Sequence, residues 1–200
     1  MQAPSKFLLS AKTSLNPDVK RNAKDRLDVI SFIYTPPFTL FMTNCTFCKI
    51  YESKQGIIYE NEHFFAQFDR FPVTPGHAEV IPKRHVASLL DLTQQEWANL
   101  QPAISEVVKV IEATNFEDLY QRFVDDPLND KSVDFCKKML NHVGTHKKPD
   151  AYNIGVNEGE AAGRTIHHLH VHVIPRFYGD VEDYIGGVRH IIPGMGNYRK

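Results

Sequence analysis

Long hydrophobic runs and an excess of one charge are both missing from the sequence. No stretch reaches the roughly 18 apolar residues that suggest a membrane-spanning helix. The chain has 23 basic and 24 acidic residues, which gives a net charge of -1. A chain so balanced has no general attraction for nucleic acid or anionic membranes. We therefore expect neither as a partner, and an anionic ligand must be held by a local site.

Cysteine is scarce, and its odd number argues against a disulfide framework. The three cysteines are Cys45, Cys48 and Cys136. Cys45 and Cys48 are separated by two residues, a spacing typical of a metal or redox pair. Cys136 stands alone and is expected to be an inert thiol. These thiols favour a reducing, cytoplasmic location.

Residues 1–41 differ in composition from the rest of the chain, with scattered basic residues and serines and weak periodicity. They could be a flexible basic extension, a targeting peptide or a segment that precedes a true start at Met42. We favour a poorly ordered N-terminal extension. Residues 42–200 are then expected to form one domain, with a helical insertion near 116–150 and an irregular C-terminal tail.

The pattern after residue 42 predicts an α+β fold. Strands are expected at 57–59, 64–68, 78–81, 152–156 and 166–174, and short insertion helices near 119–123 and 133–143. Thr93 and Glu96 form a predicted capping box before a long amphipathic helix. Pro102 is expected to kink or divide that helix. The element order indicates an antiparallel sheet with the long helix across one face.

Three histidines alternate with apolar residues in the last predicted strand. Because alternate residues of a strand face the same way, His168, His170 and His172 should share one face, about 6.6 to 7 Å apart. Such a row suits either metal binding or phosphate chemistry. The preceding loop, residues 159–165, offers backbone N–H groups, a hydroxyl and a guanidinium, which favours phosphate.

Residues 168–174 read His-Leu-His-Val-His-Val-Ile, and this stretch resembles the signature of the histidine-triad (HIT) family. Segments 45–50, 68–77 and 80–85 match further motifs of the family in order. The resemblance covers roughly residues 42–178, apart from the insertion, and is greatest to bacterial-type members. It implies a meander of about five antiparallel strands and a homodimer.

The resemblance also implies a two-step reaction at the α-phosphorus of a nucleotide through a nucleotidyl-histidine. By this analogy His170 is the nucleophile, and His168 and His172 flank it. His77 matches the fourth histidine of the family, which lies against the triad from a neighbouring strand.

Five further residues are expected to bind the nucleotide, and three of them match positions of the family. Asp69 corresponds to the residue that binds the ribose hydroxyls, and Asn157 to an amide on the phosphate side. Thr165 corresponds to a hydroxyl beside the phosphate, and Gly163 lies in the same loop. Arg164 is a departure, because the family usually has Gln there; arginine could clamp extra phosphates or point to solvent.

A structural Zn²⁺ is a further implication of the resemblance. Similar family members bind zinc through four residues that match Cys45, Cys48, His85 and His168. Two buried reduced cysteines are the alternative interpretation of the first pair.

The function we favour is hydrolysis of a dinucleoside polyphosphate, such as a diadenosine tetraphosphate-like substrate. A nucleoside phosphoramidase, a nucleotide-binding module with little catalysis and a plain metal-binding protein are the alternatives.

Overall fold

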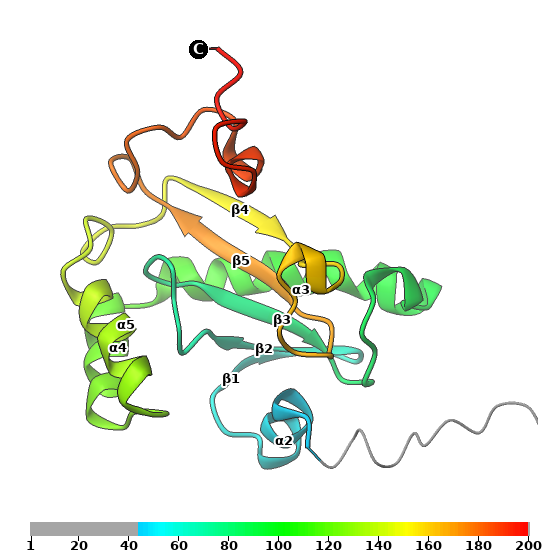
Figure 1. The fold of residues 1–200 in the computed structure, drawn as a ribbon. Helices are drawn as coiled ribbons and strands as arrows, with labels where there is room; N and C mark the ends of the chain where they lie inside the picture. The colour runs from blue at the N-terminus through cyan, green and yellow to red at the C-terminus, as the bar shows by residue number, and fades with distance from the viewer. Residues whose placement is uncertain (1–43, 200) are drawn as a thin grey trace, which may run out of the picture. The chain divides into compact units, whose positions relative to one another are not determined.

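The computed structural model describes residues 44–199, and their centre is a five-stranded antiparallel sheet (Figure 1). The strands are β1 (Ile57–Glu60), β2 (Phe64–Phe68), β3 (Ala78–Pro82), β4 (Ala151–Gly155) and β5 (Val171–Arg176). Their order across the sheet is β1-β2-β3-β5-β4. The predicted α+β class and five strands are confirmed. The expected meander holds only for β1 to β3, because β5 returns between β3 and β4.

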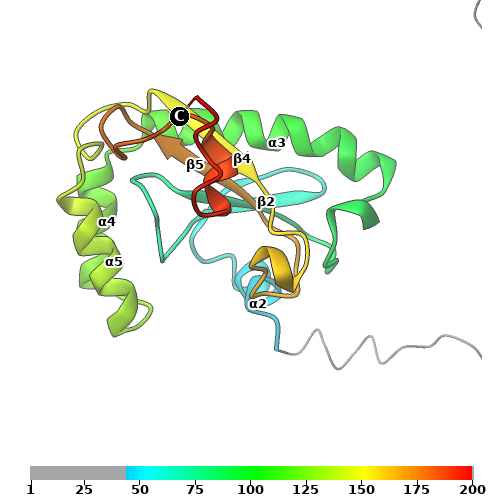
Figure 2. The same ribbon diagram turned by 45° about the horizontal axis from the view of Figure 1, so that its top comes forward.

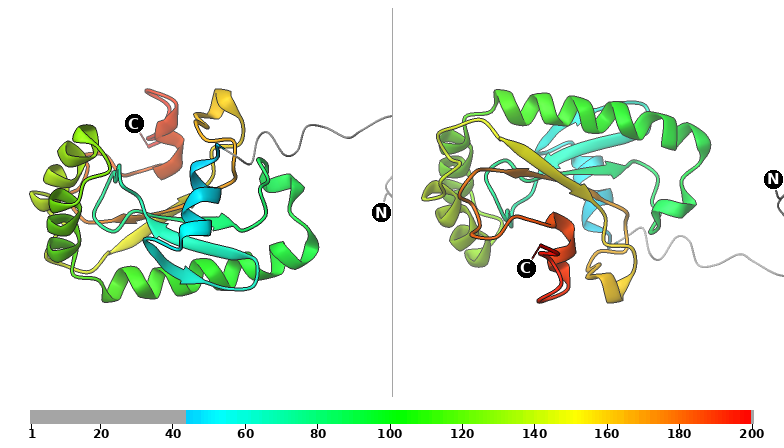
Figure 3. Two further views of the ribbon diagram at one scale, coloured as in Figure 1. Left: turned by 90° about the horizontal axis from the view of Figure 1, so that it is seen from below. Right: turned by 90° about the horizontal axis from the view of Figure 1, so that it is seen from above.

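The helix α3 (Gln94–Ala113) lies along one face of the sheet (Figure 3). The predicted capping box is confirmed: Thr93 accepts a hydrogen bond from the Glu96 amide at 3.2 Å, and Glu96 accepts one from the Thr93 amide at 2.7 Å. The expected division at Pro102 is wrong, since α3 continues through it. A proline removes one backbone donor, and the buried stripe of Leu100, Ala103, Val107 and Ile111 holds the helix on both sides.

The last strand begins later than the sequence predicts. β5 starts at Val171, whereas the expected strand started at residue 166. Its partner β3 ends at Pro82, which has no N–H to continue the ladder. The Leu169 amide instead donates to the carbonyl of Val86 at 2.6 Å. His168 and His170 therefore precede the strand, and only His172 lies within it.

The stretch predicted as an insertion contains two helices, α4 (Phe116–Asp125) and α5 (Asp130–Leu140). They pack side by side at the end of the sheet where β5 finishes (Figure 2). The ring of Phe116 meets that of Phe177 edge-on at 6.4 Å. This contact joins the insertion to the chain that follows β5.

The sheet face opposite α3 carries α2 (Thr46–Ser53) and a second, small core. Phe47, Cys45 and Cys48 pack there against Phe65 and Ile81. The described residues also contain three short 3-10 helices: η2 (Leu89–Asp91), η3 (Glu160–Ala162) and η4 (Gly187–Ile191). Beyond β5, the described part of the tail is irregular apart from η4, as expected.

The interpretation of residues 1–41 as an extension falls outside the described residues. Within residues 44–199, no helix combines the length and the hydropathy needed to span a bilayer.

Candidate active site and metal centre

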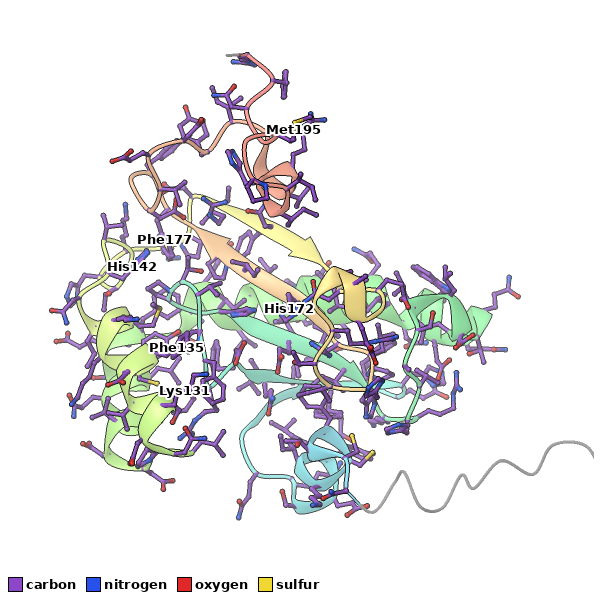
Figure 4. The ribbon with its side chains drawn as sticks, in the orientation of Figure 1. Lys131, Phe135, His142, His172, Phe177 and Met195 are labelled. Atoms are coloured by element: carbon purple, nitrogen blue, oxygen red, sulfur yellow. The ribbon has the colours of Figure 1, made fainter. Side chains whose placement is uncertain are left out.

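Strand register lines up polar side chains across the sheet face opposite α3. His172 on β5 is the direct partner of Glu79 on β3, and Glu79 is the direct partner of Gln67 on β2. Direct partners on antiparallel strands project to the same side, with Cβ atoms about 4.5–5.5 Å apart. Gln67, Glu79 and His172 therefore form one transverse row, and His172 lies at the middle of the sheet (Figure 4).

His170 stands beside this row with one ring nitrogen fixed. Its Nδ1 lies 2.8 Å from the backbone carbonyl of His168. A carbonyl can only accept, so Nδ1 carries the proton and Nε2 keeps its lone pair. The ring packs against Phe47 at 5.1 Å and edge-on to His172 at 4.9 Å. These contacts fix the ring with Nδ1 committed to a carbonyl, so Nε2 is the nitrogen left to act as a nucleophile.

His172 is oriented by a chain of two partners. Its Nδ1 lies 3.1 Å from Nε2 of His77, and His77 Nδ1 lies 3.2 Å from a carboxylate oxygen of Asp69. The Asp69–His77 pair is at ion-pair distance, but its atoms are too poorly aligned for a hydrogen bond. Nδ1 of His77 is therefore buried without a well-formed hydrogen bond. With a proton on Nδ1 of His77, His172 Nδ1–H donates to His77 Nε2. Nε2 of His172 is then left as an acceptor.

Burial keeps these imidazoles uncharged at neutral pH. It lowers the pKa of His172 to about 4, and the neighbouring His77 and His170 reinforce the effect. Burial also lowers the pKa of His77, although Asp69 opposes that shift. The other carboxylate oxygen of Asp69 accepts a hydrogen bond from the Phe71 amide at 2.8 Å. Its ribose role stays a prediction.

The turn before His77 is fixed by the insertion. The Gly76 amide donates to the hydroxyl of Tyr120 on α4 at 2.7 Å. Gly76 has φ +82°, and a Cβ there would lie 2.7 Å from the ring of Phe116. Only glycine suits both the left-handed backbone and this close approach. The insertion thereby helps to position His77.

Glu79 is a functional-site residue that the sequence analysis missed. Its side chain is buried on the histidine face, and Gln67 donates to it at 2.9 Å. Burial raises the pKa of Glu79 to about 8, with the charge of Asp69 adding to the effect. The sequence did carry a sign of this residue, because Glu79 is the one charged residue in a strand that is otherwise apolar.

The four residues predicted as metal ligands come together at the other end of the histidine segment. Cys45 and Cys48 come from the start of α2, His85 follows β3, and His168 precedes β5. Their ligand atoms all lie within 4.8 Å of one another. His168 Nδ1 lies 3.4 Å from Cys45 Sγ and 3.6 Å from Cys48 Sγ. Cys48 Sγ lies 3.3 Å from His85 Nδ1.

These spacings fit an ion with tetrahedral coordination. Zn–S bonds of about 2.3 Å and Zn–N bonds of about 2.0–2.1 Å imply S···N edges of roughly 3.5 Å, close to the three distances found. His168 is also correctly protonated for this role, since Nε2 lies 2.8 Å from the Pro82 carbonyl and Nδ1 is left for an ion. Burial and the neighbouring Cys45 raise the pKa of the Cys48 thiol to about 12. A bound dication would reverse that shift.

The predicted phosphate loop lies between β4 and β5, but its residues are not gathered at the histidines. Asn157 and Thr165 are exposed, and Gly163 ends η3 with φ +95°. A Cβ on Gly163 would lie 3.8 Å from the Asn157 side-chain nitrogen, so these two are neighbours. Within residues 44–199, no hydrogen bond or ring contact joins the three to His170 or His172. Their phosphate roles stay predictions.

Arg164 takes neither of the orientations considered from the sequence. Its guanidinium donates to the carbonyl of Ala87 and lies 3.6 Å from the carboxylate of Glu158. Glu158 also accepts a hydrogen bond from the Leu89 amide at 2.9 Å. The side chain is only 15% exposed. It ties its own loop to the segment after β3.

Comparison with known proteins finds relatives of a single kind. An uncharacterised HIT-like protein of Methanocaldococcus jannaschii is 29% identical over 69% of this chain and 83% of that protein. A Mycobacterium tuberculosis protein named AP-4-A phosphorylase is 30% identical over 70% of this chain and 56% of that protein. A zinc-bound histidine triad family protein from Mycobacterium smegmatis is a structural match with 29% identity and a TM-score of 0.44, covering 72% of this chain and 82% of that one.

The family model of the HIT domain matches residues 51–179, well over half of the chain. This range includes the histidine segment, His77 and the insertion between them. On this match, together with the sheet and the histidine face, the chain belongs to the HIT family.

Proposed function

We propose that the protein is a nucleotide hydrolase or transferase that cleaves its substrate at the α-phosphorus. The observation that carries the proposal is the environment of His170. Its Nδ1 is committed to the His168 carbonyl, and its Nε2 is free on the same face as His172 and His77. An imidazole held in this form attacks phosphorus without first losing a proton.

The reaction takes two steps. In the first, the lone pair of His170 Nε2 forms a bond to phosphorus, and the bond from phosphorus to the leaving oxygen breaks with its electron pair. In the second, a water oxygen bonds to phosphorus, and the P–N electron pair returns to Nε2. His172 Nε2, uncharged and without a proton, accepts one proton from that water and passes it to solvent.

Dinucleoside polyphosphates are the substrate class we favour. The relative named AP-4-A phosphorylase supports this choice, although this chain spans only 56% of it. Asp69 is proposed as the ribose partner, with Asn157, Gly163 and Thr165 on the phosphate side. Arg164 is bound to Ala87 and Glu158 and so is not proposed as a phosphate clamp.

Zinc is the metal we propose for the cluster of Cys45, Cys48, His85 and His168. Two thiolates and two imidazoles with tetrahedral spacing are a typical structural zinc set. The ion supplies no reaction chemistry there; it joins α2 to the histidine segment. Both thiols must stay reduced for this role, which favours a reducing compartment such as the cytoplasm. The homodimer stays a prediction.

Product analysis tests the proposal. Purified protein is incubated with diadenosine and diguanosine polyphosphates and with adenosine phosphoramidates, with and without inorganic phosphate. We expect a nucleoside monophosphate from water, or a nucleoside diphosphate when phosphate is the acceptor. His170→Ala should lose all detectable turnover while its circular dichroism spectrum is unchanged. Full activity in His170→Ala would falsify the assignment of the nucleophile.

A further inference from the structure

Glu79 has no place in the reaction described so far, yet it lies at the centre of the histidine face. One of its carboxylate oxygens lies within 4.8 Å of ring nitrogens of both His170 and His172. The side chain is buried, with 6% of its surface exposed. Burying a carboxylate is costly unless a cation or several donors compensate. A group retained at such a position has either a partner or a function.

The surroundings of Glu79 do not stabilise a negative charge. Among residues 44–199, its side chain forms no salt bridge, and its one hydrogen bond comes from the neutral amide of Gln67. The titratable groups around it are Asp69 after β2, His77 on the turn into β3, His170 just before β5 and His172 within β5. Asp69 repels a second charge, and burial lowers the pKa of His77 and of His172, so these two rings supply no positive charge at neutral pH. A protonated carboxyl is the form that this environment favours.

We propose that Glu79 is a further catalytic residue, a neutral carboxylic acid whose O–H donates a hydrogen bond to an oxygen of the substrate's α-phosphate. The inference rests on the proposed function, because that function places the phosphate at His170. The proton stays on Glu79 throughout; the residue stabilises the negative charge on the phosphate oxygens as His170 attacks. An ionised Glu79 would repel the same oxygens. A buried carboxyl kept neutral to donate a hydrogen bond is an established catalytic arrangement.

Three variants separate this role from alternatives. Glu79→Gln keeps a donor of nearly the same size, and Glu79→Leu removes it. Glu60→Gln is the matched control, because Glu60 is a β1 carboxylate that pairs with Lys54 and Lys83 away from the histidines. At pH 6.5 we expect wild-type turnover in Glu60→Gln, turnover within about fivefold of wild type in Glu79→Gln, and a loss of roughly 10²-fold in Glu79→Leu.

The pH dependence is the decisive readout. Wild-type turnover should fall as pH rises through about 8, where Glu79 loses its proton. Glu79→Gln has no proton to lose and should keep its turnover to higher pH. Equal pH profiles for wild type and Glu79→Gln, or wild-type turnover in Glu79→Leu, would overturn the proposal.

Binding of AMP can be measured without turnover and so tests Glu79 separately from the reaction. Titration calorimetry should show AMP binding to wild type weakening by roughly tenfold between pH 7 and pH 9, and a much smaller change in Glu79→Gln. The infrared carbonyl stretch of a protonated carboxyl should be present at pH 7, absent in Glu79→Gln, and shifted by AMP. If wild type turns over no nucleotide but shows these changes, the proposed function and the catalytic role of Glu79 fail, and only its hydrogen bond to the phosphate stands. If turnover occurs and the band is missing at pH 7, only the role of Glu79 fails.

Discussion

His168 and His170 lie two residues apart on one backbone segment, yet the structure gives them opposite surroundings. The His168 ring faces two thiols and another imidazole at distances suited to a shared ion. The His170 ring faces Phe47 and His172, and the carboxyl group of Glu79 lies near both histidines. In our proposal the same side chain is therefore a ligand at one end and a nucleophile at the other. Neighbouring residues, more than the histidine motif itself, decide which.

The backbone explains how the two ends stay distinct. The segment up to His170 lies outside the ladder, beyond the proline that ends β3, whereas His172 lies within β5. The carbonyl of His168 links the two ends, because it accepts a hydrogen bond from Nδ1 of His170, and the Phe47 ring contacts both histidines. An ion held by the His168 ring would therefore help to orient His170 through the backbone. The predictions below test whether the two ends can be separated.

The largest expected effect is on the metal end. Cys45→Ser should lose nearly all bound zinc and about 4 kcal/mol of unfolding free energy, since metal loss is among the strongest single-residue effects. Metal analysis and denaturant titration measure both. Cys136→Ala is the matched control, because Cys136 is buried in the main core away from the cluster; it should keep one zinc per chain. A full zinc complement in Cys45→Ser would show that the cluster is not the metal site.

The next effect is on the catalytic end. Asp69→Asn should lower kcat by roughly 10 to 100-fold, a typical cost of losing the group that orients a functional histidine. Zinc content should not change. If Asp69 serves only to bind ribose, KM will rise and kcat will stay at the wild-type value, which would contradict the orienting role.

A smaller effect is expected at Glu79, whose burial should make the free energy of unfolding fall as pH rises. Native Glu79 keeps its proton up to a pKa of about 8, whereas the unfolded chain releases it near the ordinary value of 4.5. Between these values the native state binds more protons, so this group makes wild type less stable as pH rises. Relative to wild type, Glu79→Gln should gain about 2 kcal/mol on going from pH 5 to pH 7. Thermal unfolding at both pH values measures the difference; a constant difference would mean that Glu79 is ionised throughout.

The smallest effect is expected at Arg164. Its side chain joins two surface loops through Ala87 and Glu158 and contacts neither histidine end. Arg164→Gln should change kcat/KM by less than about threefold and lower the free energy of unfolding by less than about 1 kcal/mol. A large rise in KM for longer polyphosphates would show that the guanidinium swings to the substrate.

The sequence predicted most of the fold because its patterns are local. The capping box at Thr93, the strand Phe64–Phe68 and the two insertion helices all follow from residues close together in the chain. The start of β5 could not be predicted in the same way. It depends on where the partner strand ends, at Pro82, and that pairing joins residues about 90 positions apart.

The site was predicted unevenly for the same reason. His170 and the four predicted metal ligands lie in recognisable motifs, and the structure brings those four together. Glu79 was missed because one polar residue in an apolar strand gives no sign of what it faces. Arg164 was undecided because its partners, the Ala87 carbonyl and Glu158, are set by how two loops meet.

The central claim is that His170 alone forms the covalent bond to the substrate. Wild-type protein can be mixed with a dinucleoside polyphosphate and stopped with alkali, which preserves P–N bonds. The peptide carrying residues 168–176 and the peptide carrying His77 are then fragmented by mass spectrometry. We predict one nucleoside monophosphoryl group on His170, which disappears on longer incubation as the product forms. An adduct on His77 or His172, or turnover with no adduct at any time, would contradict the account.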